Sequence, residues 1–155
     1  MIQYDSKFTG ARQEPVSGIV VRAAGAGDLE AVEGIQRACP EAAHWNVADY
    51  LQQEFHVAVV GNSIAGFLVL RTVADDEKEI LNLAVAPEFR RRGIAKALFR
   101  HSLETFRGSI FLEVRASNEA AINLYKAMQF QQVSSRVKYY ENPTETAIVM
   151  KFHSC

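Results

Sequence analysis

A stretch of basic and small residues near the middle of the chain has the composition that an anion-binding site needs. It consists of Arg90, Arg91, Arg92, Gly93, Ile94, Ala95 and Lys96. The stretch lies where a predicted strand gives way to a predicted helix, and the first N–H groups of a helix have no acceptor within the helix. The aligned peptide dipoles add about half a positive charge at that end. A diphosphate is therefore a suitable ligand, because Gly93 and Ala95 leave room for phosphates beside the backbone.

The nucleotide-binding loops with well-known signatures do not explain this stretch. The chain has neither Gly-x-x-x-x-Gly-Lys-Ser/Thr nor Gly-x-Gly-x-x-Gly. A P-loop or a Rossmann nucleotide site is therefore not supported. The alternative without a ligand is a helix start whose basic side chains are solvated.

The elements around this stretch predict an α/β fold. Strands are predicted at residues 19–21, 56–60, 64–73, 79–86, 110–114, 131–140 and 146–152, and helices at residues 29–39, 47–51, 91–106 and 118–128. We expect a mixed central sheet of about six to seven strands flanked by about four helices. Short links make the strands within 56–86 antiparallel, whereas the strand–helix–strand unit within 79–114 requires a parallel pair.

Capping and turn residues mark the ends of these elements. Asp28 and Asn46 are predicted to cap the first two helices. Gly61-Asn62-Ser63 predicts a hairpin turn, because glycine and asparagine tolerate positive φ. Gly108 is expected to end the third helix, and Asn142-Pro143 to join the last two strands.

The composition of the whole chain is that of an ordinary globular protein. Its 155 residues are 48% hydrophobic and 23% charged, with a formal net charge of -1. No overall field attracts nucleic acid or an anionic membrane, so we expect neither as a partner. We expect residues 1–17 to be a flexible lead-in and residues 18–155 to form one domain. We also expect a cytoplasmic protein, because neither a signal peptide nor a membrane-spanning run is recognised.

One local pattern in this order of elements resembles the GNAT superfamily of N-acetyltransferases. The pattern is Arg-x-x-Gly-x-Ala from Arg90 to Ala95, and it follows Leu-Ala-Val-x-Pro at residues 83–87. In that superfamily the strand is splayed after a bulge, so that its backbone can pair with the pantetheine amides of acetyl-CoA. The resemblance implies that Leu83, Ala84 and Val85 supply this backbone and that residues 90–96 hold the pyrophosphate. It implies acetyl-CoA as the cosubstrate and a GNAT fold.

The resemblance extends downstream and becomes more specific. Residues 112–118 and 120–130 are similar to the bacterial ribosomal-protein-alanine N-acetyltransferases, the RimI type, and so are the closing strands with Tyr139-Tyr140 and residues 147–150. Residues 40–46 resemble the substrate-side loop of that branch. Two departures stand out: Gln129 replaces an expected helix-ending glycine, and the loop after Tyr140 is shorter, with acidic residues of the branch replaced. The altered loop bears on the acceptor more than on acetyl-CoA.

Acetyl transfer to an amine needs a base for the amine proton and an acid for the departing thiolate. Glu113 lies between apolar Leu112 and Val114, so it faces away from them. The resemblance gives Glu113 the role of general base, and an ordinary solvated carboxylate is the alternative. Tyr125 lies on the apolar face of its helix, where spacing alone favours core packing. The resemblance instead makes Tyr125 the general acid, and a phenol with a pKa near 10 is neutral at pH 7.

Four further candidates complete the predicted site. Asn118 begins a helix, where it is a suitable N-cap, and the resemblance adds a contact with the cosubstrate. Trp45, Tyr139 and Tyr140 are candidates for the acceptor cleft, with simple packing as the alternative for each. The four histidines have no metal-ligand spacing, so we expect no metal.

Three functions remain open on these grounds. The first is transfer of an acetyl group to the α-amino group of a protein's N-terminal alanine, with a ribosomal protein as the acceptor. The second is acetylation of a small amine, such as a polyamine, an amino acid or an aminoglycoside. The third is a non-catalytic module that binds acyl-CoA, which the presence of both Glu113 and Tyr125 opposes. We expect a monomer or a weak dimer.

Overall fold

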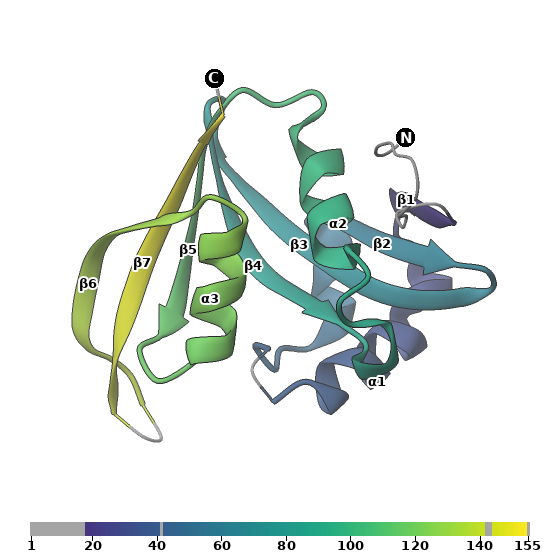
Figure 1. Cartoon of the computed structure of the whole chain (residues 1–155), viewed down its shortest axis with the longest axis horizontal. Coiled ribbons are helices and arrows are strands. Elements are labelled where there is room, and N and C mark those ends of the chain that lie inside the picture. Colours follow the sequence, from purple (N-terminus) through teal and green to yellow (C-terminus); the bar gives the residue numbers. More distant parts are fainter. Residues whose placement is uncertain (1–17, 41, 142–143, 155) are drawn as a thin grey trace.

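The computed structural model describes residues 18–40, 42–141 and 144–154. The predicted lead-in, residues 1–17, and the predicted turn at residues 142–143 lie outside this range. Within the described residues, seven strands form one mixed sheet in the order β1-β2-β3-β4-β5-β7-β6 (Figure 1). The strands are β1 (Ile19–Ala23), β2 (Glu54–Val60), β3 (Ser63–Ala74), β4 (Glu77–Val85), β5 (Gly108–Arg115), β6 (Gln131–Tyr140) and β7 (Glu145–Ser154).

The predicted helices are all found, although one of them is a 3-10 helix. The α-helices in the described ranges are α1 (Leu29–Ala38), α2 (Ile94–Leu103) and α3 (Glu119–Ala127), and the 3-10 helices are η1 (Ala26–Asp28), η2 (Val47–Gln52) and η3 (Pro87–Phe89). The prediction of a helix over residues 91–106 was too long at both ends. Gly93, at φ +80, places the start of α2 after the arginines, and the helix ends at Leu103. Gly108 was expected to end this helix but begins β5.

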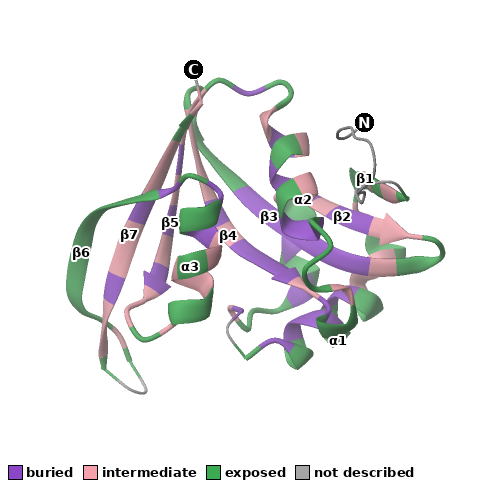
Figure 2. Cartoon of the chain, in the orientation of Figure 1, coloured by how far each residue is buried: buried purple, intermediate pink, exposed green. Residues whose placement is uncertain are grey.

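Strand β3 carries the core of the molecule, because both of its faces are covered (Figure 2). Phe67 and Val69 belong to the apolar cluster beneath α1 and η2, whereas Leu68 and Leu70 belong to the cluster on the other face, which α2 covers. Side chains alternate between the two faces of a strand, so helices on both sides leave Phe67, Leu68, Val69 and Leu70 all at 0% exposure. Edge strand β6 is exposed along almost its whole length, apart from Tyr140.

One of the two predicted helix caps was wrong. Asp28 precedes α1 but makes no side-chain cap there. Its carboxylate instead accepts hydrogen bonds from Gly25 N at 2.8 Å and from the Arg22 guanidinium, so it caps η1. Asn46 caps η2 as predicted, with its Oδ1 accepting from Ala48 N at 3.1 Å. Within η2, Val47 and Tyr50 are buried, whereas Leu51 is 42% exposed.

The end of α3 shows how the chain manages without the expected glycine. Gln129 adopts the left-handed conformation itself, at φ +76. Phe130 N donates to Tyr125 O at 3.0 Å, which closes the helix in the manner of a Schellman turn. This conformation costs a residue with a Cβ about 1 kcal/mol. Phe130, which the turn directs into the core, is 2% exposed and offsets that cost.

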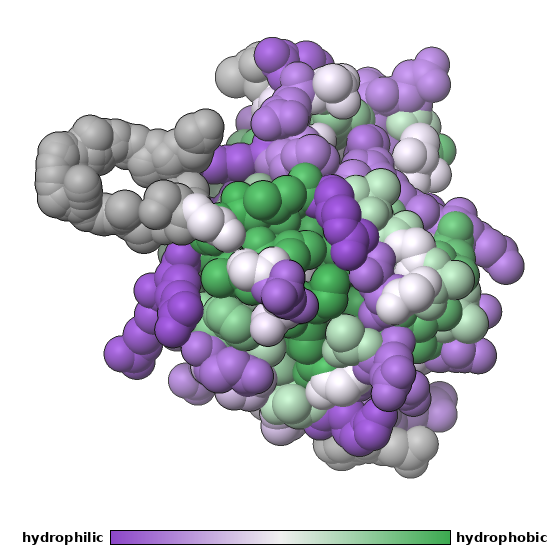
Figure 3. All heavy atoms as spheres, turned by 90° about the vertical axis from the view of Figure 1, so that its right-hand side faces the viewer, coloured by the Kyte–Doolittle hydropathy of each residue, from purple (hydrophilic) through white to green (hydrophobic). Residues whose placement is uncertain are grey.

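The surface retains some apolar area on the side of β1. Figure 3 faces the turn between β2 and β3 and shows apolar side chains at the centre of this face, with hydrophilic residues around them. Val20 on β1 is 59% exposed. In the described ranges, the helices fall short of the length and apolar character that crossing a membrane requires.

Candidate active site

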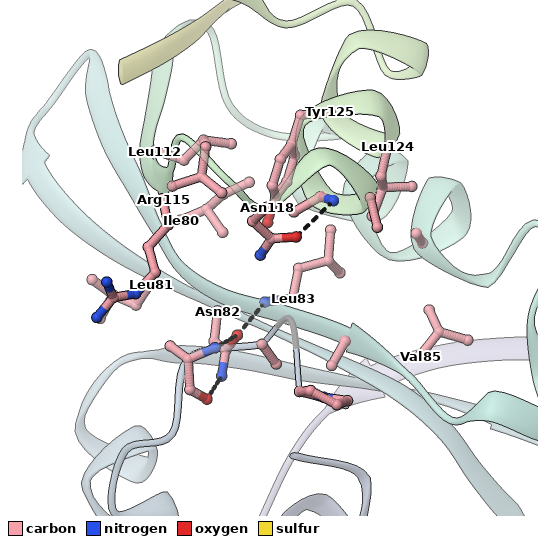
Figure 4. A pocket seen from close by; sticks show the side chains of 18 of the residues that line it. Ile80, Leu81, Asn82, Leu83, Val85, Leu112, Arg115, Asn118, Leu124 and Tyr125 are labelled. Carbon is pink, nitrogen blue, oxygen red and sulfur yellow. Dashed lines mark hydrogen bonds between the residues drawn. The ribbon is translucent and has the colours of Figure 1, made fainter. Parts of the chain in front are cut away.

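The sheet splits between β4 and β5, and the split is the origin of the site. The two strands run parallel but pair only from Glu77 to Glu79, opposite Ser109 to Phe111. Beyond that point they diverge in a V, as Figure 1 shows. Residues of β4, β5, α2 and α3 line the resulting cleft, which has a volume of about 900 Å³ (Figure 4). The predicted parallel pair is therefore confirmed, and it is short.

A bulge in β4 turns the backbone of this strand toward the cleft. Val69 of β3 pairs with Asn82 and Leu70 pairs with Ile80, so Leu81 is an extra residue. Ala86 N donates to Ala65 O of β3 at 2.8 Å. Because backbone groups alternate in direction along a strand, those of Leu83 and Val85 face the split. The cleft thus has a strand edge along one wall.

The turn before α2 brings backbone N–H groups to the same cleft. The first helical hydrogen bond runs from Ala97 N to Gly93 O at 2.9 Å, so the N–H groups of residues 94–96 precede it. Arg91 has a left-handed conformation, at φ +65. This conformation costs a residue with a Cβ about 1–2 kcal/mol and is often retained where the backbone serves a ligand. The turn has the shape and the dipole of an anion site.

The basic side chains of this turn divide into three groups. Arg91 and Lys96 line the cleft. Arg90 also lines it but folds back, donating from Nε to Val85 O at 3.4 Å and from Nη2 to Cys39 Sγ at 3.4 Å. Arg92 does not line the cleft, because its guanidinium lies 5.3 Å from the centre of the Phe89 ring.

Helix α3 contributes Asn118 and Tyr125. Asn118 Oδ1 accepts from Ala121 N at 3.1 Å, which confirms the predicted N-cap. Tyr125 is 7% exposed and packs edge-on against Phe130, with ring centres 5.5 Å apart. In Figure 4 its ring points into the cleft beside Asn118. Burial raises the pKa of the Tyr125 phenol, so it is neutral at pH 7 and remains a proton donor.

Strand β5 places Glu113 in the cleft, between buried Leu112 and Val114. The Glu113 side chain is 19% exposed, and its Oε2 accepts from Arg136 Nη1 at 2.6 Å. The Arg136 guanidinium also lies 4.1 Å from the centre of the Tyr139 ring. The carboxylate is therefore already ion-paired at the mouth of the cleft.

Glu113, Arg136 and Tyr139 form one set of a carboxylate, an arginine and a tyrosine, and a second set of this kind lies on the rim. The Arg115 guanidinium is 4.5 Å from the centre of the Tyr140 ring and 3.4 Å from Glu145 Oε1. Hydrogen bonds from Ser117, and then from Arg115, hold the pKa of Glu145 below its usual range. Tyr140 lines the cleft, whereas Tyr139, at 45% exposure, does not.

Residues 42–46 form the wall opposite α3, and we call them the loop wall. His44 and Trp45 line the cleft from this wall, with Trp45 51% exposed. Arg92 and Tyr139 are therefore the only predicted site residues that the cleft does not include. Other lining residues were not predicted, and they include Ala43, His44, Leu81, Asn82, Arg115 and Leu124.

Of these, Asn82 had a signal that sequence analysis overlooked. It is an amide residue between two leucines of an apolar strand, and it is 5% exposed. A buried amide needs partners, so its position alone indicates a polar network. Across the described residues, no three histidine, cysteine, aspartate or glutamate side chains are grouped to hold a metal ion.

Comparisons with known proteins fit this geometry. Residues 29–130 match the model of the acetyltransferase (GNAT) family. The [ribosomal protein bS18]-alanine N-acetyltransferase of Salmonella typhimurium is 43% identical over 94 residues, a match that covers 56% of this chain and 62% of that protein. The N-alpha-acetyltransferase RimI of Mycobacterium tuberculosis is 36% identical over 88 residues, which covers 56% of each. The chain thus spans about three fifths of the curated relatives it matches.

Solved structures agree over most of the chain. The ribosomal-protein-S18-alanine N-acetyltransferase of Escherichia coli superposes with a TM-score of 0.72 at 27% identity, covering 88% of this chain and 94% of that one. Ard1 of Thermoplasma volcanium gives a TM-score of 0.78 at 29% identity, covering 89% and 99%. These likenesses confirm the predicted fold, and with the match over residues 29–130 they lead to one conclusion: the chain belongs to the GNAT family of acetyltransferases.

Proposed function

We propose that this protein transfers the acetyl group of acetyl-CoA to the α-amino group of a protein that begins with alanine. The observation that carries the proposal is the cleft itself. One strand edge, one helix N-terminus, one carboxylate and one buried phenol converge on it. The relatives from Salmonella typhimurium and Escherichia coli carry a name for this reaction on ribosomal protein bS18, which favours a ribosomal protein as acceptor.

We assign the binding of acetyl-CoA to β4 and α2, which we call the donor half. The strand edge at Leu83 and Val85 is offered to the pantetheine amides, whereas the backbone of Ala84 between them pairs with Phe67 of β3. The N–H groups of residues 94–96 and the Arg91 and Lys96 side chains offer the diphosphate a positive site. The Asn118 amide lies on the other wall. These groups fit a thioester with a long amide-bearing arm and a diphosphate.

Glu113 and Tyr125 are the proposed base and acid. The amine nitrogen attacks the thioester carbonyl carbon, and the new C–N bond forms as the C–S bond breaks. The amine proton passes to the Glu113 carboxylate, directly or through water, and the Tyr125 hydroxyl gives its proton to the departing sulfur. Positioned acids and bases contribute about 10²- to 10⁴-fold each. Holding the amine and the thioester together supplies a further large share of the acceleration.

The acceptor enters between the loop wall and Tyr140. We call the loop wall, Tyr140 and Glu113 together the acceptor half. Trp45 on the loop wall and Tyr140 on the opposite rim offer apolar surfaces to the first side chain of a peptide. The acceptor amine then meets Glu113 beside its ion pair with Arg136.

A direct assay tests the proposal. Steady-state acetylation is measured with acetyl-CoA and a peptide that begins with alanine, beside a panel of polyamines, amino acids and aminoglycosides. We expect the peptide to give the highest kcat/KM. Turnover of the small amines alone would mean that the acceptor is a small amine and not a protein N-terminus. If the protein binds acetyl-CoA but acetylates no amine, the remaining function is that of a non-catalytic module that binds acyl-CoA.

A further inference from the structure

The side-chain amide of Asn82 is buried and forms hydrogen bonds to four other residues. Its Nδ2 group has two hydrogens: one donates to Ala43 O at 2.8 Å, and the other is shared between Tyr50 OH at 3.0 Å and Gln36 Oε1 at 3.1 Å. Its Oδ1 accepts from Leu83 N at 3.0 Å and from Ala43 N at 3.2 Å. One side chain therefore touches α1, η2, the loop wall and the strand edge of the cleft.

The pairing with Ala43 has the form of a short piece of sheet. Both backbone groups of Ala43 bond to the two ends of one amide, so Asn82 acts in place of a neighbouring strand. Gln36 adds a third anchor, because its Nε2 donates to Trp45 O at 2.7 Å. The loop wall lies between α1 and η2 and has no strand ladder of its own. These side chains hold its backbone inward while His44 and Trp45 face the cleft.

The network is closed and uncharged. Tyr50 OH donates to Gln36 Oε1 at 2.6 Å, and Gln36, Tyr50 and Asn82 are 5%, 1% and 5% exposed. Burial raises the pKa of the Tyr50 phenol, which keeps it a neutral donor. A fully satisfied buried network of this kind fixes one geometry, because any displaced member leaves a polar group without a partner.

The same amide also reaches the donor half. Leu83 N belongs to the backbone that faces the split, and its partner in the structure is Asn82 Oδ1. Residue 82 itself pairs with Val69 of β3, inside the sheet. The side-chain amide of Asn82 thus connects three parts of the site. These are the sheet, the loop wall and the part of β4 that is proposed to bind acetyl-CoA, which we call the thioester strand.

We propose that Asn82 is a positioning residue that sets the loop wall, and so the acceptor, at a fixed distance from the thioester strand. The inference deepens the proposed function and rests on it. Asn82 does not touch the reacting atoms, and it acts through Ala43 and Trp45. Because a displacement of about 1 Å at an acceptor can cost on the order of 10²-fold in rate, loss of this anchor weakens use of the acceptor far more than binding of acetyl-CoA.

The test compares Asn82→Leu, which keeps the size of the side chain but removes every hydrogen bond, with Tyr50→Phe, which removes one hydroxyl. We expect Asn82→Leu to raise the acceptor KM at least about tenfold, with the acetyl-CoA Kd within about threefold of wild type. Tyr50→Phe should shift the acceptor KM in the same direction by about threefold. Ser102→Ala is the matched control, because it removes another buried hydrogen bond, to Phe99 O at 2.6 Å, outside this network.

A second readout does not depend on activity. Trp45 is the only tryptophan in the chain, so its fluorescence reports on the loop wall. We expect lower anisotropy and stronger acrylamide quenching in Asn82→Leu and no change in Ser102→Ala. Equal losses in acceptor KM and acetyl-CoA Kd, or unaltered Trp45 fluorescence, would overturn the inference.

If Asn82→Leu fails to fold, the acceptor KM and the Trp45 fluorescence are measured in Tyr50→Phe and Gln36→Leu instead. A raised acceptor KM with a looser Trp45 then supports the inference, and wild-type values of both overturn it. If the wild type acetylates no amine, the proposed function fails, and the Trp45 measurement still decides whether Asn82 orders the loop wall.

Discussion

The two halves of the cleft are built by different means. The donor half is mainly backbone: a bulged strand edge at Leu83 and Val85 and the start of α2. The acceptor half is mainly side chains that fix one another, in the Asn82 network and in the pairing of Glu113 with Arg136. Backbone offers the same groups whatever the side chains are. A site made of side chains changes with each substitution, so relatives can share a donor while differing in their acceptors.

Replacing Tyr125 by phenylalanine should give the largest effect on catalysis. The ring keeps its packing against Phe130, while the proposed acid is lost. We expect kcat to fall by about 10²- to 10⁴-fold, with the acetyl-CoA Kd unchanged by calorimetry. A wild-type kcat in this variant would remove Tyr125 from the mechanism.

The two carboxylate, arginine and tyrosine sets provide a matched pair. Glu113 lines the cleft, whereas Glu145 does not. Glu113→Gln should lower kcat/KM for the acceptor by about 10²-fold, because it removes the proposed base. Glu145→Gln should leave kcat/KM near the wild-type value in the same assay. Similar losses in both variants would mean that Glu113 acts only by structure.

The donor half can be tested through its arginines, which the structure separates. Arg91 lines the cleft, and Arg92 lies over Phe89 outside it. Arg91→Glu should raise the acetyl-CoA Kd by about tenfold, equivalent to about 1.4 kcal/mol, and Arg92→Glu clearly less. Calorimetry that finds the two variants equal would place the diphosphate elsewhere on the turn.

The smallest effect is a pH dependence at the rim. The pKa of Glu145 in the folded protein is held below its usual range. The ionised carboxylate therefore stabilises the fold at any pH above the usual carboxyl pKa of about 4.3. This stabilisation is lost as the pH falls through the lower pKa of the folded state. Glu145→Gln should therefore have a lower Tm than wild type at pH 7. The difference should persist down to about pH 4 and shrink as melting is repeated at lower pH, toward about pH 3. A difference that is constant with pH would point to packing instead of charge.

The same contrast explains what could be predicted from sequence. The donor half follows from local patterns: Pro87 ends a strand, Gly93 starts a helix, and their order predicts a βαβ unit. The placement of Arg92 was missed because spacing does not say on which side of a turn a long side chain lies. The contact between Asn82 and Gln36 could not be predicted, because the two residues are 46 positions apart and meet only through the fold. The pairing of Glu113 with Arg136 across β7 is equally invisible along the chain.

The most direct test of the proposed site is a crystal structure with a bisubstrate analogue, in which CoA is joined to the α-amino group of a peptide that begins with alanine. We predict its diphosphate at the N–H groups of residues 94–96, its pantetheine along Leu83–Val85, and the peptide between the loop wall and Tyr140. The junction should lie between Glu113 and Tyr125. An analogue bound with its junction away from this pair, or outside the split between β4 and β5, would contradict the proposed site.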